Sequence, residues 1–343
     1  MRDQVEVAMT IVVTGSAGHL GEALMRVLRH SNRRAVGIDI KPSSYTDLVG
    51  SISDQDFLGS VFRGGIQSII HTATLHKPHV VTHSHQEFVD TNITGTLCLL
   101  EAAAETGIES FVFTSTTSTF GSALTPAPGA PAAWINEEVV AIPKNIYAAT
   151  KLGAEHLCEM FAYRRKLSLI ILRTSRFFPE EDDSVAVRNR FSLDNAQLNE
   201  LLYRRVDLDD VVQAHLLALE RAPQLRFGRY IISAPTPFRK SDLLQLRQQP
   251  AVVVQRLFPD AEEIYARKGW SMFDEIDRVY VSQRAISALG WRPRWNFARA
   301  LRLVQNDEDF RSPLARAIGS KGYHDVEFLE GPYPVDAQWT GKT

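Results

Sequence analysis

The chain has 343 residues, of which 44% are hydrophobic, and this is enough for one large domain or two closely packed domains. The formal net charge of -2 provides no general field for nucleic acid or an anionic membrane, so we predict neither as a partner. The N-terminal segment is too polar for a signal peptide and no apolar run approaches the ~20 residues that span a bilayer, so we expect a cytoplasmic protein.

Short apolar runs alternate along the chain with helical patterns. Runs rich in β-branched or aromatic residues predict strands at residues 9–14, 35–39, 68–71, 110–114, 169–173 and 228–233. Helical patterns predict helices at residues 92–105, 146–163 and 206–220. Cys98 and Cys158 fall within these helices and are interpreted as buried thiols. Strands that alternate with helices predict an α/β fold with a doubly wound parallel sheet.

A glycine-spaced turn joins the first predicted strand to a helical pattern. The first glycine permits a sharp turn, the second lets backbone approach a phosphate, and the third lets the helix pack closely on the sheet. The N-terminus of the following helix would add N–H groups and partial positive charge. Its position between a strand and a helix favours a dinucleotide site over an ordinary glycine-rich turn. The predicted contacts in this turn are Gly15, Ala17, Gly18, His19, Leu20 and Gly21.

An acidic residue, Asp39, closes the second predicted strand. A carboxylate there can accept hydrogen bonds from an adenosine ribose and would repel a 2′-phosphate, which favours NAD over NADP. Lys41 and the pair Arg33 and Arg34 are the nearby cations that would argue for NADP. We interpret them as solvated surface charges, and the predicted cofactor is NAD.

Tyr147 and Lys151 are four residues apart and therefore share one face of a predicted helix. A tyrosine with its ordinary pKa of ~10 is a poor base at neutral pH, but a lysine cation nearby favours the phenolate and lowers that pKa. Such a pair is also common on helix surfaces. Together with the glycine turn, it predicts hydride transfer to or from an alcohol carbon.

These motifs resemble the extended short-chain dehydrogenase/reductase family, which includes NAD-dependent epimerases and dehydratases of nucleotide-sugars. The glycine turn is similar to its TGxxGxxG motif, and the step from Tyr147 to Lys151 matches its catalytic helix. Further matches in the family's order are His71-Thr72-Ala73-Thr74, Asn92-Ile93-Thr94-Gly95-Thr96, residues 113–121 and Asp207-Leu208-Asp209-Asp210-Val211. The resemblance covers about residues 9–235 and implies a Rossmann fold. It also implies a homodimer formed through a four-helix bundle of the helices at 92–105 and 146–163.

The resemblance implies a role for each matching residue. Tyr147 becomes the general acid/base, and Lys151 becomes its modulator and a ribose ligand. The catalytic hydroxyl aligns on Thr116, with Thr117 and Ser115 left open. Further cofactor-side positions fall on Ile52, Thr72, Ala73 and Asn92, of which Asn92 would stabilise the catalytic region from the central helix.

Three positions depart from the family pattern. Ser51 stands where an acid that contacts adenine is usual, so adenine recognition would rely on Ile52. Thr117 and Ser118 stand where similar 4,6-dehydratases have an Asp-Glu pair, which argues against dehydration. Arg176 stands where the epimerases have an asparagine that helps to hold a nucleotide-sugar, and this places a nucleotide-sugar substrate in question.

Histidines and arginines supply the candidate substrate contacts. Several histidines between 71 and 85 could form a metal site, but no cysteine or convergent acid spacing accompanies them, so we predict no metal. A substrate loop or solvated histidines are the other interpretations. Arginines between 173 and 190 could bind a carboxylate or phosphate, or could pair with the acids at 180–183. The predicted substrate contacts are His76, Thr117, Arg176 and Arg188.

The alternation of strands and helices breaks after Arg173. We predict a dinucleotide-binding Rossmann domain at residues 8–178, to which 206–235 return, and a smaller C-terminal substrate-binding domain formed by 179–205 and 236–343. The predicted function is an NAD-dependent oxidoreductase or epimerase that acts on the hydroxyl of a sugar or nucleotide-sugar. The alternatives are a dehydrogenase or reductase of a non-nucleotide alcohol (uronate or steroid-like) and a dinucleotide-sensing protein without turnover.

Overall fold

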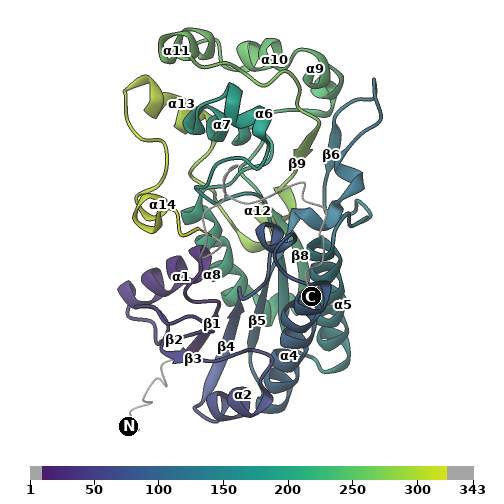
Figure 1. Ribbon diagram of the computed structural model, residues 1–343, viewed down its shortest axis with the longest axis vertical. Coiled ribbons are helices and arrows are strands. Elements are labelled where there is room, and N and C mark those ends of the chain that lie inside the picture. Colours follow the sequence, from purple (N-terminus) through teal and green to yellow (C-terminus); the bar gives the residue numbers. More distant parts are fainter. Residues whose placement is uncertain (1–9, 323–343) are drawn as a thin grey trace.

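The computed structural model describes residues 10–322, so residues 1–9 and the end of the predicted C-terminal tail lie outside the described part. Seven parallel strands form one sheet in the order β3-β2-β1-β4-β5-β7-β8 (Figure 1). They are β1 (Thr10–Thr14), β2 (Ala35–Asp39), β3 (Leu48–Val49), β4 (Ile66–His71), β5 (Ser110–Thr116), β7 (Leu169–Thr174) and β8 (Phe227–Ile232). The predicted doubly wound, Rossmann-type sheet is confirmed.

Helices cover both faces of this sheet (Figure 1). One face packs against α1 (His19–His30), α8 (Leu208–Leu225), α12 (Gln283–Leu289) and α14 (Pro313–Ile318). The other face packs against α2 (Gln55–Phe62), α4 (Gly95–Thr106) and α5 (Ile146–Arg164). Because both faces are covered, the strands carry continuous apolar runs, and residues such as Val12, Ile70 and Val112 are fully buried.

The strand order reverses at β1, which lies between β2 and β4. From β1 the chain builds outward through β2 and β3 on one side, and it then crosses to β4 on the other. Thr14, the last residue of β1, pairs with Ile38 on one side and His71 on the other. Ligands of open α/β sheets bind in the crevice outside the carboxyl ends of the strands at such a reversal. The topology therefore locates the site before any side chain is considered.

A second group of elements lies beyond the carboxyl ends of the strands, at the top of Figure 1. Its helices are α6 (Val185–Arg190), α7 (Leu193–Glu200), α9 (Leu243–Gln248), α10 (Pro250–Leu257), α11 (Ala261–Lys268) and α13 (Phe297–Gln305). Its two parallel strands are β6 (Ala133–Ile135) and β9 (Arg278–Tyr280). Side chains such as Leu198, Leu202 and Phe297 form a separate apolar core here. We refer to this group as the cap; the domain boundaries given above stay a prediction.

The remaining helical segments are short. They are α3 (His85–Val89), the π-helical turn Asp90–Thr94, and the 3-10 turns Lys77–His79, Thr117–Phe120, Ser122–Leu124 and Lys240–Asp242. The helix predicted at 92–105 therefore begins as a π-helical turn and continues as α4. Cys98 and Cys158 are buried free thiols. Within residues 10–322, no helix is long and apolar enough to cross a membrane.

Candidate active site

The glycine turn lies between β1 and α1, and two of its glycines are required by close backbone contacts. Gly15 has φ +74°, and a Cβ on it would lie 2.7 Å from the backbone nitrogen of Ala73. A Cβ on Gly21 would lie 1.9 Å from the carbonyl oxygen of Gly15. Gly18 is the N-cap of α1. The turn therefore brings backbone N–H groups and the N-terminus of α1 to the carboxyl end of the sheet, as the sequence predicts.

Asp39 ties this turn to the end of β2. Its Oδ2 accepts a hydrogen bond from the backbone N–H of Ala17 at 2.9 Å, and its Oδ1 accepts one from the N–H of Lys41 at 2.8 Å. Each carboxylate oxygen has a second lone pair, so the side chain can still accept hydrogen bonds from ribose hydroxyls.

A single cleft of about 980 Å³ opens along the carboxyl ends of the strands. It is lined by most of the residues that the sequence singles out: Gly15, Ala17, Gly18, His19, Leu20, Gly21, Asp39, Ile52, Thr72, Ala73, His76, Thr116, Thr117, Tyr147, Lys151 and Arg176. Asn92 and Arg188 are not among its lining residues. The cleft therefore joins the glycine turn to the Tyr147 helix, although some 130 residues separate them in the chain.

Asn92 lies behind the cleft wall, in the π-helical turn. Its Oδ1 accepts hydrogen bonds from the N–H of Leu75 at 2.9 Å and the hydroxyl of Thr74 at 2.8 Å. Its Nδ2 donates to the carbonyl of Leu75 at 2.9 Å and to the hydroxyl of Thr150 at 3.0 Å. Asn92 therefore fastens the loop after β4 to α5, which carries Tyr147. π-Helical turns occur frequently at functional sites.

Tyr147 and Lys151 lie in the first turns of α5, which is capped by Asn145. Both side chains are buried in the cleft wall, and the Lys151 Nζ lies 4.0 Å from the centroid of the Phe113 ring. The Thr116 side chain lines the same cleft and accepts a hydrogen bond from the backbone N–H of Ser118 at 3.1 Å. Ser115, one of the two other hydroxyls left open, donates to Glu155 at 2.5 Å, whereas Thr117 also lines the cleft. Thr116 therefore stays the predicted hydroxyl beside Tyr147, with Thr117 as its alternative.

Burial controls the ionisation of this pair in the protein alone. Burial raises the pKa of Tyr147 to about 12, and the Thr116 hydrogen bond opposes that rise. Burial lowers the pKa of Lys151 to about 7, while Cys158 and Glu155 oppose that fall. Desolvation of the phenol sets the upward direction of the Tyr147 pKa, and the lowering by a lysine cation that the spacing led us to expect is not among its causes in the protein alone.

A buried ion-pair network joins α5 to β7 and β8. Glu155 is fully buried and forms a bidentate pair with Arg173, with contacts of 2.7 and 2.9 Å. Arg229 approaches the same carboxylate at 3.0 Å. Because Ser115 also donates to Glu155, the network joins the strand that carries Thr116 to the helix that carries Lys151. Arg173 is thus part of the scaffold and is 3% exposed.

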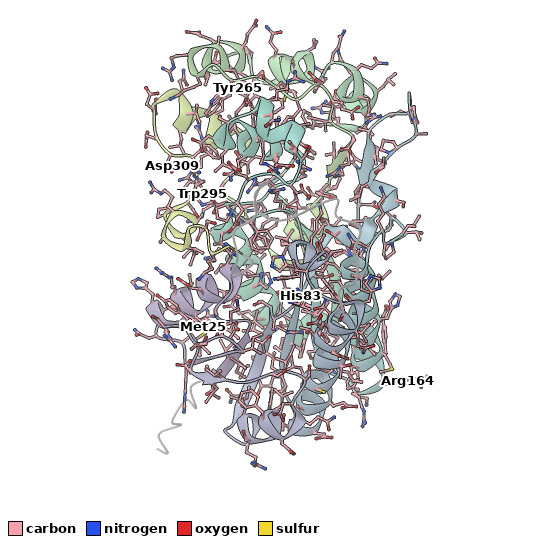
Figure 2. The ribbon with its side chains drawn as sticks, viewed as in Figure 1. Met25, His83, Arg164, Tyr265, Trp295 and Asp309 are labelled. Carbon is pink, nitrogen blue, oxygen red and sulfur yellow. The ribbon has the colours of Figure 1, made fainter. Side chains whose placement is uncertain are left out.

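The histidine segment contributes both scaffold and cleft lining. His71 lies between the hydroxyls of Thr14 at 2.7 Å and Thr96 at 3.1 Å, and burial holds its pKa well below the ordinary value. His76 stacks on Phe178, with ring centroids 5.4 Å apart, at the cleft. His83 is labelled in Figure 2 between the sheet and the cap. Among residues 10–322, no three histidine, cysteine or acidic side chains are grouped to hold a metal ion.

The acidic loop after β7 engages the arginines near it. Arg176 lines the cleft, and it pairs with Asp182 at 3.2 Å and donates to the carbonyl of Glu181 at 2.6 Å. Arg188 donates to the carbonyl of Asp182 at 2.7 Å. Pairing with this loop was one of the two interpretations of these arginines. Direct contact of Arg176 and Arg188 with substrate stays a prediction.

Several cleft residues were not identified from the sequence. Glu180 accepts from the ring of His19 at 2.7 Å and from the hydroxyl of Ser320 at 2.9 Å, which brings the end of the described chain to the glycine turn. Burial raises the pKa of Glu180, but the hydrogen bond and charge of His19, with further hydrogen bonds from its own backbone and Ser320, together lower it to about 2. Other unpredicted lining residues are Lys144, Phe178, Arg204, Arg278, Tyr280 and Lys321. No motif marks them, and only the fold brings them to the cleft.

Comparisons with known proteins show which sequences this chain is similar to. The model of a family described as "NAD dependent epimerase/dehydratase family" matches residues 11–232. A UDP-glucose 4-epimerase of Streptomyces lividans is 30% identical over 159 residues, which cover 43% of this chain and 45% of the relative. A dTDP-D-glucose 4,6-dehydratase of Dictyostelium discoideum is 29% identical over 191 residues, which cover 49% of this chain and 44% of the relative. The chain spans about half the length of the curated relatives it matches.

Solved structures share the fold over most of their length. A short-chain dehydrogenase/reductase superfamily protein from Agrobacterium tumefaciens with bound NAD has a TM-score of 0.61 and 24% identity, covering 90% of this chain and 97% of that one. A UDP-glucose 4-epimerase from Thermotoga maritima with UDP-glucose has a TM-score of 0.61 and 22% identity, and the match covers 87% of this chain and 98% of that one. At these identities the likeness concerns the fold.

Proposed function

The chain belongs to the NAD dependent epimerase/dehydratase family, and from this premise we propose that it transfers hydride between NAD and a hydroxyl-bearing carbon of a sugar or nucleotide-sugar. Family membership agrees with the resemblance stated from the motifs and with NAD as the cofactor. The observation that carries the proposal is that Tyr147, Lys151 and Thr116 line the same cleft as the glycine turn.

The residues of the cleft fit a dinucleotide. At Gly15 and Gly21 the backbone is too close to its neighbours for a side chain, and the N-terminus of α1 opens on the same space. Asp39 stands at the end of β2, where it would accept from the adenosine ribose. NAD, when bound, supplies a nicotinamide carbon that accepts or returns hydride.

Tyr147 and Thr116 would hold one substrate oxygen between them. Tyr147 would take the proton of the alcohol during oxidation and return it during reduction, while the Thr116 hydroxyl fixes the oxygen. Because the pKa of Tyr147 is about 12 in the protein alone, the phenol keeps its proton at neutral pH. A protonated Lys151 in the same wall favours the phenolate, so it would assist the step in which Tyr147 acts as a base.

Two outcomes of this chemistry differ in their use of cofactor. An epimerase returns the hydride to the opposite face of the keto intermediate, so NAD is regenerated, whereas a dehydrogenase releases NADH. Thr117 and Ser118 in place of an Asp-Glu pair argue against dehydration. Arg176, in place of an asparagine, favours a dehydrogenase of a non-nucleotide alcohol as the second candidate.

Replacement of Tyr147 by Phe tests the proposal. With NAD and a panel of sugars and nucleotide-sugars, NADH absorbance and product chromatography would report dehydrogenation and epimerisation separately. We expect Tyr147→Phe to lower turnover by at least ~100-fold while calorimetry shows NAD binding retained. Tyr45→Phe is the matched control, because Tyr45 packs between Arg26 and Arg29 outside the cleft. Full activity of Tyr147→Phe, or an absence of NAD binding by the wild type, would overturn the proposal. NAD binding without turnover of any substrate would favour the sensing protein instead.

We also propose that the chain forms a homodimer through α4 and α5 and acts in the cytoplasm. Met160 and Tyr163 support the dimer, because these large side chains on α5 are 47% and 68% exposed. Native mass measurement tests it: a monomer at micromolar concentration would contradict the proposed bundle.

A further inference from the structure

The cap contributes very little to the wall of the cleft. Of residues 184–320, all of which the structure describes, only Arg204, Arg278 and Tyr280 line it. A second nucleotide beside the dinucleotide would need an extended wall on the cap side, with apolar or aromatic surface for a base. The cap instead presents two guanidinium groups and a phenol. We call Arg204 and Arg278 the arginine pair.

Each member of the arginine pair is held by carboxylates through one terminal nitrogen. Arg204 uses Nη2 to pair with Asp182 at 2.8 Å and with Glu200 at 2.7 Å, and Arg278 uses Nη1 to bond both oxygens of Asp277, at 2.9 and 2.7 Å. Within residues 10–322, neither Nη1 of Arg204 nor Nη2 of Arg278 has a hydrogen-bond partner. The two side chains are 20% and 17% exposed, and both line the cleft.

The two cations lie close together. The backbone N–H of Tyr280 donates to the carbonyl of Tyr203 at 3.0 Å, which sets β9 beside the segment that carries Arg204. Burial lowers the pKa of Arg278, Tyr280 raises it, and the Arg204 cation lowers it again, with a net upward direction. Eight lysine and arginine side chains but only four carboxylates line the cleft. Two neighbouring guanidinium groups in such a wall favour an anion between them, because forked N–H donors match carboxylate and phosphate oxygens.

The arginine pair also lies close to the catalytic hydroxyl. Thr116 pairs with Thr174 across β5 and β7, and Arg176, two residues further on, donates its N–H to the carbonyl of Arg204 at 3.2 Å. Two residues of extended chain rise ~7 Å and the two strand spacings add ~10 Å sideways, so ~12 Å separates the backbone of Thr116 from that of Arg204. A sugar ring with one substituent, together with the side chains at either end, can span this separation.

We infer that the arginine pair binds a carboxylate or phosphate ester carried directly by the sugar, so that the substrate is an acidic monosaccharide and not a neutral sugar linked to a nucleotide. This inference rests on the proposed function for the identity of the reaction. It places the anion contact at the arginine pair and not at Arg173, whose guanidinium is paired with the buried Glu155 carboxylate.

Matched sugars test the inference on the wild-type protein. Calorimetry on the NAD-loaded protein would compare glucuronate with glucose, galacturonate with galactose, the two hexose 6-phosphates and UDP-glucose. We expect one acidic monosaccharide to bind at least ~10-fold more tightly than its neutral counterpart, with affinity that falls as salt rises. Preference for a hexuronate identifies a carboxylate, and preference for a hexose 6-phosphate identifies a phosphate ester. Equal binding of neutral sugars, or tight binding of UDP-glucose alone, would overturn the inference.

Arg278→Gln assigns the effect to the arginine pair. We expect KM for the acidic sugar to rise at least ~10-fold, since a hydrogen bond between charged groups is lost, while the Kd for NAD and the thermal midpoint stay unchanged. Arg190→Gln is the matched control, because Arg190 pairs with Asp274 on the cap surface outside the cleft. Equal losses for acidic and neutral sugars, or in both variants, would contradict the assignment.

The two proposals fail in different ways. If Arg278→Gln loses acidic-sugar binding but the wild type transfers no hydride, the anion site stands and the proposed reaction is overturned. If the wild type transfers hydride on neutral sugars, and Tyr147→Phe abolishes this activity while Arg278→Gln leaves it unchanged, the proposed reaction stands and the anion site is overturned.

Discussion

Glu155→Gln removes one charge from the centre of the buried network and keeps the shape of the side chain. The Glu155 carboxylate is 0% exposed and contacts Arg173 at 2.7 Å and Arg229 at 3.0 Å. Without it, the guanidinium of Arg173, 3% exposed, has no carboxylate to offset its desolvation. Breaking a buried pair in this way costs about 3 to 5 kcal/mol. At ~2 to 3 °C per kcal/mol for a domain of this size, the thermal midpoint should fall by roughly 6 to 15 °C.

Thermal unfolding followed by circular dichroism measures this effect, and an exposed pair provides the control. Arg33 and Glu220 approach to 2.6 Å, but their side chains are 41% and 48% exposed. Solvent screens such a pair, so Glu220→Gln should cost less than ~1 kcal/mol. A double variant, Glu155→Leu with Arg173→Met, should lose less than the sum of the two single losses, because neither charge is then left buried alone.

The reasoning would be refuted if Glu155→Gln melted within about 2 °C of Glu220→Gln. That result would mean that Arg173 finds another partner or that water reaches the network. Additive losses in the double variant would show that Glu155 and Arg173 contribute separately, contrary to the bidentate geometry.

Three further changes address the cofactor side of the cleft. Gly21→Ala places a Cβ 1.9 Å from the Gly15 carbonyl oxygen, so we expect a loss of ~1 to 3 kcal/mol in stability and at least ~10-fold in NAD affinity; calorimetry with normal affinity would contradict this. Asp39→Asn removes the charge that would repel a 2′-phosphate, so the NADP-to-NAD affinity ratio should rise at least ~10-fold, and an unchanged ratio would count against the role of Asp39. Glu180 has a folded pKa of about 2 against an ordinary 4.5, so its stabilisation is complete above pH ~4.5 and is lost as the pH falls towards 2. The free energy of unfolding of Glu180→Gln should therefore depend less on pH between about 2 and 4.5 than that of the wild type. The same pH dependence in both proteins would show that another group is responsible.

Local signals were sufficient for the sheet. Strands buried on both faces must be apolar along their length, and this is visible as runs such as Ile11 to Val13 and Phe111 to Phe113. The glycine turn was also predictable, because most of its constraints involve residues within the turn or just after the next strand, although Gly15 also meets Ala73 after β4. Asp39 is an example: its partners Ala17 and Lys41 lie in the turn and just after β2.

A smaller C-terminal domain was predicted, but the strands and contacts inside the cap were not predictable from local patterns. β6 and β9 have three residues each, and their register pairs Ala133 with Arg278, which are 145 positions apart. Strands this short carry little periodicity of their own, and their partner is set by the tertiary fold. The contact between His19 and Glu180 spans 161 residues and has the same origin. No sequence motif links His19 to Glu180.

The arginines show most clearly why the chemistry of the cleft required the fold. In the sequence, Arg173 and Arg188 flank a loop after a strand, where a free cation would suit an anionic ligand. Whether a guanidinium is free depends on which carboxylate it meets, and Glu155 meets Arg173 only because α5 packs against β7. Arg204 and Arg278 lie in segments without a motif, yet both line the cleft, and their carboxylate contacts use Nη2 of Arg204 and Nη1 of Arg278. Residue type and spacing identify candidate cations, but the arrangement of their counter-ions decides which of them can bind a ligand.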